Sequence, residues 1–415
     1  CAAVAAASAL SAQKFELNQL TITAWSFSRL EFRDAPLLES ISSAALPKIC
    51  GAEVALEDHH SAQLHEGSLD PTDILMFAYE LEAAGWLTDE ALSTCSSALR
   101  RIGELQDGGP ASAGSGSSCP PEYTGRISAA DLGSEPRILA ENPLVSIVWK
   151  PCGWTVSVGT DHLNPDAPQL PSSPGMELEE VSGEVGEERA LQHWLGASRL
   201  AAAYPRGPLR DADVQYGLLH RLDRGTSGLI ACATSYTGFY QASLEFYLRQ
   251  TRKHYVCLCH GHVPATWQII DEPLKVIQDG KAKRSVAVAD GEPALTELRG
   301  IGHLSGPRGE VLSVVEVRLH TGRMHQIRSH MGNRGYPLVG DPSYANGCDG
   351  CPVPADDIRD WCRRICLHAC RLAFTAGDSK PLDVSCPLPR DLAASLAALT
   401  ATDGPSRGML AGWRH

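Results

Sequence analysis

The sequence has no long hydrophobic run and no overall excess of positive charge. None of its apolar stretches approaches the roughly 18 residues that a membrane-spanning helix requires, so we expect no membrane partner. The 415 residues carry a formal net charge of −13, which excludes a basic surface spread over the whole chain. A chain of this length has room for two or three domains, so the distribution of the charge is more informative than its sum.

Methionine is absent from the first position, where Cys1 stands. We therefore expect the sequence to be a fragment, from which an upstream targeting peptide would be missing. The 14 cysteines are scattered, and several of them, such as Cys232, Cys257 and Cys259, lie in apolar strand-like runs. This usage is typical of a reducing compartment rather than of a disulfide scaffold. The expected location is intracellular, in the cytoplasm or in an organelle.

The acidic charge is concentrated toward the beginning of the chain. Residues 1–136 contain 7 Lys and Arg against 19 Asp and Glu, which is a net charge of −12. Residues 157–193 contain one Arg and eight Asp and Glu, and this segment is interpreted as an acidic surface insertion. The rest of the C-terminal part has a net charge of +6, a surplus that suits contact with a phosphate backbone.

Residues 1–105 are predicted to form pairs of helices. In residues 17–45, apolar side chains recur at steps of three and four on both sides of a break at 33–36, which predicts an αα-hairpin. A similar pattern at 72–99 makes a weak internal repeat. The first copy resembles the helical-hairpin repeats of octotricopeptide-like organelle RNA-binding proteins, and a small helical bundle is an equal alternative. Because the segment is acidic and a poor phosphate binder, we expect it to serve in positioning or to contact a protein.

Residues 106–136 are rich in Gly, Ser and Pro, which predicts a flexible tether at a domain boundary. Residues 137–400 are predicted to form the second domain, and residues 401–415 a tail. Strands in this domain, for example at 144–149 and at 253–263, are followed by single helices without regular βαβ repetition. This order predicts an α+β fold with a mixed, largely antiparallel sheet.

One carboxylate stands between two arginines in residues 217–230, GLLHRLDRGTSGLI. Two apolar runs flank this charged cluster and its Gly-Thr-Ser-Gly turn, which predicts charged residues at the mouth of a strand pair. Arg221 and Arg224 favour the ionised form of Asp223, because a nearby cation lowers the pKa of a carboxylate. Such a carboxylate can act as a nucleophile at a sugar or base carbon. An ordinary salt bridge at a strand end explains these residues equally well.

Residues 220–230 resemble the catalytic signature of the RluA family of RNA pseudouridine synthases, whose essential aspartate corresponds to Asp223. Two further segments match in the family's order: Lys253-His254-Tyr255, and TGRMHQIR at 321–328. The resemblance implies the pseudouridine synthase fold, with flanking helices and a central cleft. It also implies isomerisation of uridine in structured RNA, either rRNA or tRNA, with no cofactor. The lack of a nucleotide-binding glycine loop agrees with that expectation.

Three residues are catalytic by this resemblance. Asp223 would attack C1′ of the ribose or help to remove the 2′ proton. Tyr255 would stack on the uracil, and its hydroxyl is a candidate to assist removal of the C5 proton. Arg323 would pair with Asp223 and hold it ionised.

Five further residues are expected to bind the substrate. Arg221 would occupy the space that the extruded base leaves in the RNA helix, and Leu367 would form a wall of the base pocket. His325, Gln326 and Arg328 belong to the third matching segment. We expect the two basic residues among them to contact RNA phosphates or to stabilise the turn.

Other interpretations remain. Six residues offer ligands for a structural zinc ion, namely Cys348, Cys351, Cys362, Cys366, His368 and Cys370. No metal is the favoured prediction, since Cys366 and Cys370 would partly face the core. A non-catalytic RNA-binding protein that has kept the fold is the alternative function. An aspartic protease is excluded, because only one Asp-x-x-Thr-Ser-Gly segment exists.

Overall fold

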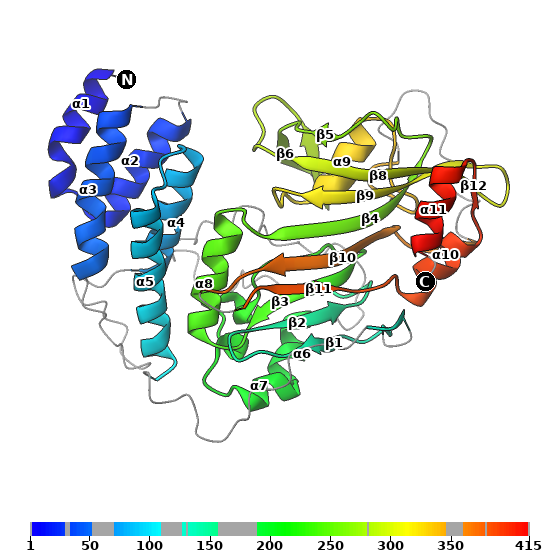
Figure 1. Cartoon of the computed structure of the whole chain (residues 1–415), viewed down its shortest axis with the longest axis horizontal. Coiled ribbons are helices and arrows are strands. Elements are labelled where there is room, and N and C mark those ends of the chain that lie inside the picture. The colour runs from blue at the N-terminus through cyan, green and yellow to red at the C-terminus, as the bar shows by residue number, and fades with distance from the viewer. Residues whose placement is uncertain are drawn as a thin grey trace.

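The computed structural model describes residues 2–29, 34–51, 70–108, 127–129, 132–156, 189–279, 282–345, 360–377 and 380–413. Most of the expected insertion at 157–193 and the centre of the expected tether lie outside the described residues. A large twisted sheet fills the C-terminal part, and a group of helices lies at one end of it (Figure 1). No helix in the described part of the chain is both long and apolar enough to span a bilayer.

The N-terminal part is helical. Its helices are α1 (Ala2–Ser11), α2 (Leu17–Arg29), α3 (Ala35–Gly51), α4 (Pro71–Ala83) and α5 (Asp89–Gln106). The two expected helix pairs are present as α2 with α3 and α4 with α5. Local sequence sets where the second pair begins: the Asp70 side chain accepts from Thr72 N, and the Thr88 side chain accepts from Ala91 N. Both are N-cap hydrogen bonds that satisfy free backbone donors.

These helices dock on α8 (Tyr236–Tyr247), as Figure 1 shows. One apolar core combines residues of α2 to α5 with Tyr240 and Leu244 of α8. Helix α5 passes so close that a Cβ at Gly103 would lie 2.4 Å from the Cα of Thr237. The Asp107 carboxylate accepts hydrogen bonds from the backbone nitrogens of Tyr236 and Thr237, at 2.8 and 3.0 Å. The predicted flexible tether is therefore wrong at its first residues, because Asp107 is bonded to the C-terminal part.

The C-terminal part is built on a ten-stranded sheet with the order β1-β2-β3-β10-β4-β9-β8-β12, in which β11 pairs with β10 and β5 with β8. The strands are β1 (Arg137–Ala140), β2 (Val145–Lys150), β3 (Ser227–Ala233), β4 (Arg252–His260), β5 (Ile269–Ile270), β8 (Thr296–Ser305), β9 (Val311–Leu319), β10 (Leu367–Phe374), β11 (Leu382–Ser385) and β12 (Thr400–Ala401). Among the described pairs, only β3 with β10 is parallel. The prediction of an α+β fold with a mixed, largely antiparallel sheet is confirmed.

Helices and a small second sheet surround this sheet. They are α6 (Leu191–Ala197), α7 (Arg199–Ala203), α9 (Gln326–Asn333), α10 (Arg390–Ala397), α11 (Gly404–Trp413), and the pair of β6 (Leu274–Asp279) with β7 (Ala282–Ala287). Residues 401–413 do not form the tail that was predicted, since β12 pairs with β8 and Leu410 of α11 is 2% exposed. The Trp413 indole also donates to Glu316 at 2.8 Å.

Strand β4 is buried on both faces. Tyr255, Cys257 and Cys259 pack into the core on one face. Val256 and Leu258 pack on the other face, in a core that includes residues of α10 and α11. Both faces are buried because Val256 and Leu258 are apolar, as are the residues that alternate with them. The burial fixes Tyr255 in the middle of the sheet, beside the site.

Candidate active site

Asp223 lies on a tight turn immediately before β3. The chain on the other side of the turn runs antiparallel to β3: Leu219 N donates to Ala231 O, and Ala231 N donates to His220 Nε2 at 3.0 Å. Thr226 N closes the turn by donating to Asp223 O at 2.9 Å. These bonds therefore fix the position of Asp223 at the end of β3.

His220 supports this turn. Its ring stacks on Phe246 with the ring centres 5.2 Å apart. Burial, together with the nearby Lys253 cation, lowers the pKa of His220 from 6.5 to about 3. The imidazole is therefore neutral at physiological pH and accepts a backbone hydrogen bond.

The eight site residues predicted from the sequence all line one cavity. It holds about 470 Å³ of space between atoms, a figure that includes the open solvent at its mouth. The predicted residues in its lining are Arg221, Asp223, Tyr255, Arg323, His325, Gln326, Arg328 and Leu367, and the others are Leu222, Thr226, Leu319, Gly322, Met324 and Ile327. The fold thus gathers segments that are more than 100 residues apart in sequence.

The basic partner of Asp223 is Arg328, in the first turn of α9. Its Nη1 donates to Asp223 Oδ2 at 3.1 Å, while Nε and Nη2 donate to the two oxygens of Asp341 at 2.7 and 3.0 Å. The Arg328 side chain is 6% exposed. Of the two roles expected for Arg328, contact with RNA phosphates or support of the turn, the geometry fits the second, because its guanidinium is enclosed between two carboxylates.

The expected pairing of Arg323 with Asp223 is also wrong. Arg323 Nη2 lies 3.5 Å from Glu292 Oε2, and its Nε donates to Pro293 O at 3.1 Å. The reason is direction: side chains of a helix point back toward its N-terminus, so Arg328 in α9 reaches the Asp223 turn. Arg323 lies on the turn before α9 and contributes to the cavity wall.

The charge of Asp223 is set by its neighbours. Burial opposes ionisation, but His325, Arg328 and Arg221 outweigh it and lower the pKa of Asp223 from 3.8 to about 2. His325 Nε2 lies 3.9 Å from Asp223 Oδ2. The side chain remains 15% exposed to the cavity, so the site presents a carboxylate at neutral pH.

Tyr255 lies on β4, opposite Val317 of β9 and Ala369 of β10. It is 7% exposed and contributes to the cavity lining. Burial, with a smaller contribution from Asp223, raises the pKa of Tyr255. The residue therefore presents an aromatic surface and a protonated hydroxyl.

Gln326 holds the turn rather than the substrate. Its Oε1 accepts from Thr321 Oγ1 at 2.7 Å and from Arg323 N at 3.0 Å, and its Nε2 donates to Leu295 O and to Thr296 Oγ1. These bonds use both amide hydrogens and the carbonyl oxygen. The expectation of a substrate contact for Gln326 is wrong, because its amide is engaged within the protein.

Two residues that shape the site were not predicted. Asp341 orients Arg328, and Tyr344 places its ring 5.2 Å from the Arg328 guanidinium carbon. The Tyr344 hydroxyl also lies 3.1 Å from His325 Nδ1. Only a weak signal for these two residues is present in the sequence. Asp341 is a single carboxylate after the apolar Leu338-Val339-Gly340, in a segment that has no basic residue.

The zinc interpretation receives no support from the residues that the structure describes. Within them, no three His, Cys, Asp or Glu side chains are placed to hold a metal ion. Cys348 and Cys351 lie outside the described residues.

A sequence model of the RNA pseudouridylate synthase family matches residues 145–333. These residues belong to the RNA pseudouridylate synthase family, in its RluA-type branch. The chain is 32% identical over 192 residues to ribosomal large subunit pseudouridine synthase D of Neisseria meningitidis serogroup A, covering 45% of this chain and 49% of that protein. It is also 32% identical over 177 residues to dual-specificity RNA pseudouridine synthase RluA of Vibrio parahaemolyticus, covering 43% of this chain and 64% of that protein.

The chain also has neighbours among solved structures. Human RNA Pseudouridylate Synthase Domain Containing 1 is 20% identical with a TM-score of 0.43, and the alignment covers 70% of this chain and 97% of that one. The match to the first of the curated relatives spans about half of its length.

Proposed function

We propose that this protein isomerises uridine to pseudouridine in structured RNA, with rRNA or tRNA as the substrate class. One observation carries the proposal: Asp223, held ionised by Arg328, opens into the same cavity as Tyr255 and Leu367. The family membership of residues 145–333 supports it. The net charge of +6 outside the acidic segments suits an RNA partner.

The proposed reaction requires no external reactant. The N1–C1′ bond of uridine breaks, the uracil turns in the cavity, and a C5–C1′ bond forms. C5 loses its proton and N1 gains one, so neither an oxidant nor an energy source is consumed. The target base must leave its stack to reach the cavity, and we expect Arg221, which lines the cavity, to fill the vacated space.

The chain's own residues supply a charge and a surface. Asp223 attacks C1′ or helps to remove the 2′ proton, and in both routes it acts as a carboxylate. Arg328 fixes its orientation through one hydrogen bond at 3.1 Å. Tyr255 and Leu367 contact the ring of the uracil, and an aromatic face tolerates the rotation of the free base.

The test is release of tritium from RNA labelled at uridine C5, with binding of the same RNA measured in parallel. The expected result is release by the unaltered protein, no release by Asp223→Asn, and RNA affinity within about threefold in both. The control is Asp213→Asn, a change at an exposed carboxylate outside the cavity. Release that persists in Asp223→Asn would refute the assignment. RNA binding by the unaltered protein without release would favour the non-catalytic alternative.

We also propose that the acidic helical segment contacts a protein partner. Ile22 and Trp25, one helical turn apart on α2, are 60% and 45% exposed, which is high for large apolar side chains. Crosslinking from position 22 in a lysate tests this, and recovery of RNA alone would contradict it.

A further inference from the structure

We propose that Arg364 is a positioning residue for the Asp223 turn. Its guanidinium, oriented by Asp391, holds the residues that follow Asp223 and thereby keeps the carboxylate in register with Arg328. The inference rests on the proposed function, since it concerns the rate of that reaction.

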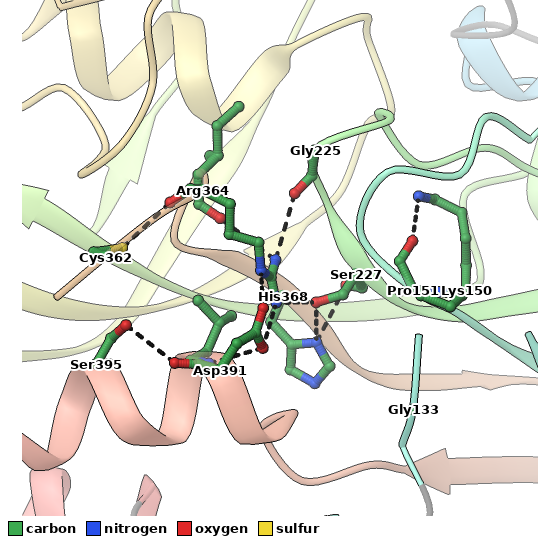
Figure 2. A network of polar contacts seen from close by, with 12 residues as sticks. Gly133, Lys150, Pro151, Gly225, Ser227, Cys362, Arg364, His368, Asp391 and Ser395 are labelled. Atoms are coloured by element: carbon green, nitrogen blue, oxygen red, sulfur yellow. Dashed lines mark hydrogen bonds and ion pairs between the residues drawn. The ribbon is translucent and has the colours of Figure 1, made fainter. Parts of the chain in front are cut away.

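The guanidinium of Arg364 contacts the turn at two points. Its Nη2 donates to Ser227 Oγ at 2.9 Å, and its Nη1 donates to Gly225 O at 3.4 Å. Figure 2 shows the side chain extending between the Gly225 carbonyl, Ser227 and the helix that carries Asp391. Gly225 and Ser227 flank Thr226, whose nitrogen closes the turn on Asp223 O. Arg364 therefore holds the C-terminal half of the turn.

Asp391 fixes the direction of this guanidinium. Its Oδ2 accepts from Arg364 Nε at 2.6 Å, and its Oδ1 lies 3.3 Å from Nη2. Asp391 lies in the first turn of α10, where Leu392 N also donates to its Oδ1 at 2.8 Å. The Arg364 side chain is 12% exposed while that of Asp391 is 56% exposed, so the carboxylate approaches from the solvent side. With Nε and one side of Nη2 facing Asp391, Nη1 and the other hydrogen of Nη2 are left to face the turn.

The other half of the turn is held from the end of β2 and the turn that follows it. Gly153 N donates to Arg224 O at 2.8 Å, and Lys150 Nζ lies 3.5 Å from the same oxygen. Hydrogen bonds thus hold the turn on both sides of Thr226. Those of Arg364 come from the segment that precedes β10. Losing the hydrogen bonds on one side lets the Asp223 carboxylate shift relative to Arg328. A shift of about 1 Å at a reacting group can lower a rate by about 100-fold.

A direct role in RNA binding does not fit the geometry. Arg364 is not among the residues that line the cavity. Its donors are directed at the oxygens of Asp391, Ser227, Gly225 and its neighbour Ile365. The side chain therefore acts through the turn and does not touch the substrate.

The experiment compares two arginine–aspartate pairs. Arg364→Lys and Asp391→Asn are measured alone and together, because lysine keeps the charge but cannot make the forked contacts. The matched control pair is Arg371 with Asp383, which makes the same two-point contact at 2.8 and 2.6 Å on β10 and is about 40% exposed. Single-turnover tritium release, RNA affinity and thermal unfolding are measured for every variant.

We expect Arg364→Lys to lower the single-turnover rate by about 10- to 100-fold, with RNA affinity within about threefold. Asp391→Asn should lower the rate less, and the double variant should match Arg364→Lys, because Asp391 acts through Arg364. Arg371→Lys and Asp383→Asn should change the rate by less than about twofold. A displaced Asp223 should also move the acid limb of the rate profile to higher pH in Arg364→Lys, which a purely structural role would not do.

Three outcomes would overturn the inference: an unchanged rate in Arg364→Lys, a loss of RNA affinity that parallels the loss of rate, or an equal loss in the Arg371 control. Failure of the proposed function looks different, since the unaltered protein would then release no tritium.

Discussion

Asp223 and Arg328 are joined by a hydrogen bond of 3.1 Å between Oδ2 and Nη1, although 105 residues separate them in sequence. The contact is a salt bridge, and both residues also line the cavity. The two interpretations of Asp223, as a reactive carboxylate and as a salt-bridge partner, are therefore compatible. Because Asp341 takes two further donors of Arg328, the guanidinium has one preferred orientation. The orientation of the reacting carboxylate follows from that arrangement.

Removing Arg328 should lower the free energy of unfolding. Arg328→Gln leaves the buried Asp341 carboxylate without its cation, and such a loss costs about 3–5 kcal/mol in the free energy of unfolding. Urea unfolding at pH 7 measures this. The control, Arg371→Gln, breaks a pair that is about 40% exposed and should cost less than about 1 kcal/mol. Equal costs for the two variants would contradict the assigned role of Arg328.

Stability should depend on Asp223 at low pH. The folded pKa of Asp223, about 2, lies below its ordinary value of 3.8, so ionisation stabilises the folded state. The contribution, on the order of 2 kcal/mol, is complete above the ordinary value and is lost as the pH falls toward 2. We expect the stability advantage of the unaltered protein over Asp223→Asn to shrink between pH 5 and pH 2. A pH-independent difference would show that the pKa of Asp223 is not lowered.

Tyr255 should bind RNA through its ring. Tyr255→Phe keeps the aromatic face that lines the cavity, and we expect its RNA affinity to stay within about threefold. Tyr255→Leu removes the stacking surface, which is worth roughly 1–3 kcal/mol per base, so affinity should fall by about 5- to 100-fold. Titration of a fluorescent RNA measures both variants. Equal RNA affinities of Tyr255→Phe and Tyr255→Leu would show that Tyr255 does not bind RNA by stacking.

The Thr226 hydroxyl is expected to bond the substrate. Among the described side chains, Thr226 Oγ1 is buried without a hydrogen-bond partner, and the residue lines the cavity. Thr226→Val should therefore lower tritium release by at least about fivefold without lowering the free energy of unfolding, because no protein hydrogen bond is lost. Thr251→Val is the matched control, since Thr251 Oγ1 is likewise buried and unpartnered but lies outside the cavity. If both variants keep full activity, the hydroxyl has no role in the reaction.

The contact of α5 with α8 should tolerate no side chain at Gly103. Gly103→Ala places a methyl group 2.4 Å from the Cα of Thr237, which forces the helices apart and should cost roughly 1–3 kcal/mol. The same change at Gly51, where nothing lies within 4 Å, should be neutral or stabilise the helix by up to about 1 kcal/mol. Thermal unfolding distinguishes the two. Similar stabilities would mean that the helical segment is not docked as described.

The helix pairs and the strands could be predicted from the sequence because their signals are local. Apolar spacing at 17–45 and 72–99 and capping residues such as Thr88 act within a few residues. The flexible tether was wrong at Asp107 for the opposite reason. Its hydrogen bonds reach Tyr236, 129 residues away, and no local pattern reports such a contact.

The sequence by itself determined which residue types the site contains, because Asp223, Tyr255 and Leu367 belong to short segments whose character is visible in the chain. The tertiary structure alone decided how they pair. Because of where α9 starts and how it runs, Arg328 bonds to Asp223, whereas Arg323 lies beside Glu292. Arg364 and Asp341 became visible only with the fold, since their roles depend on distances between segments that approach only when the sheet has formed.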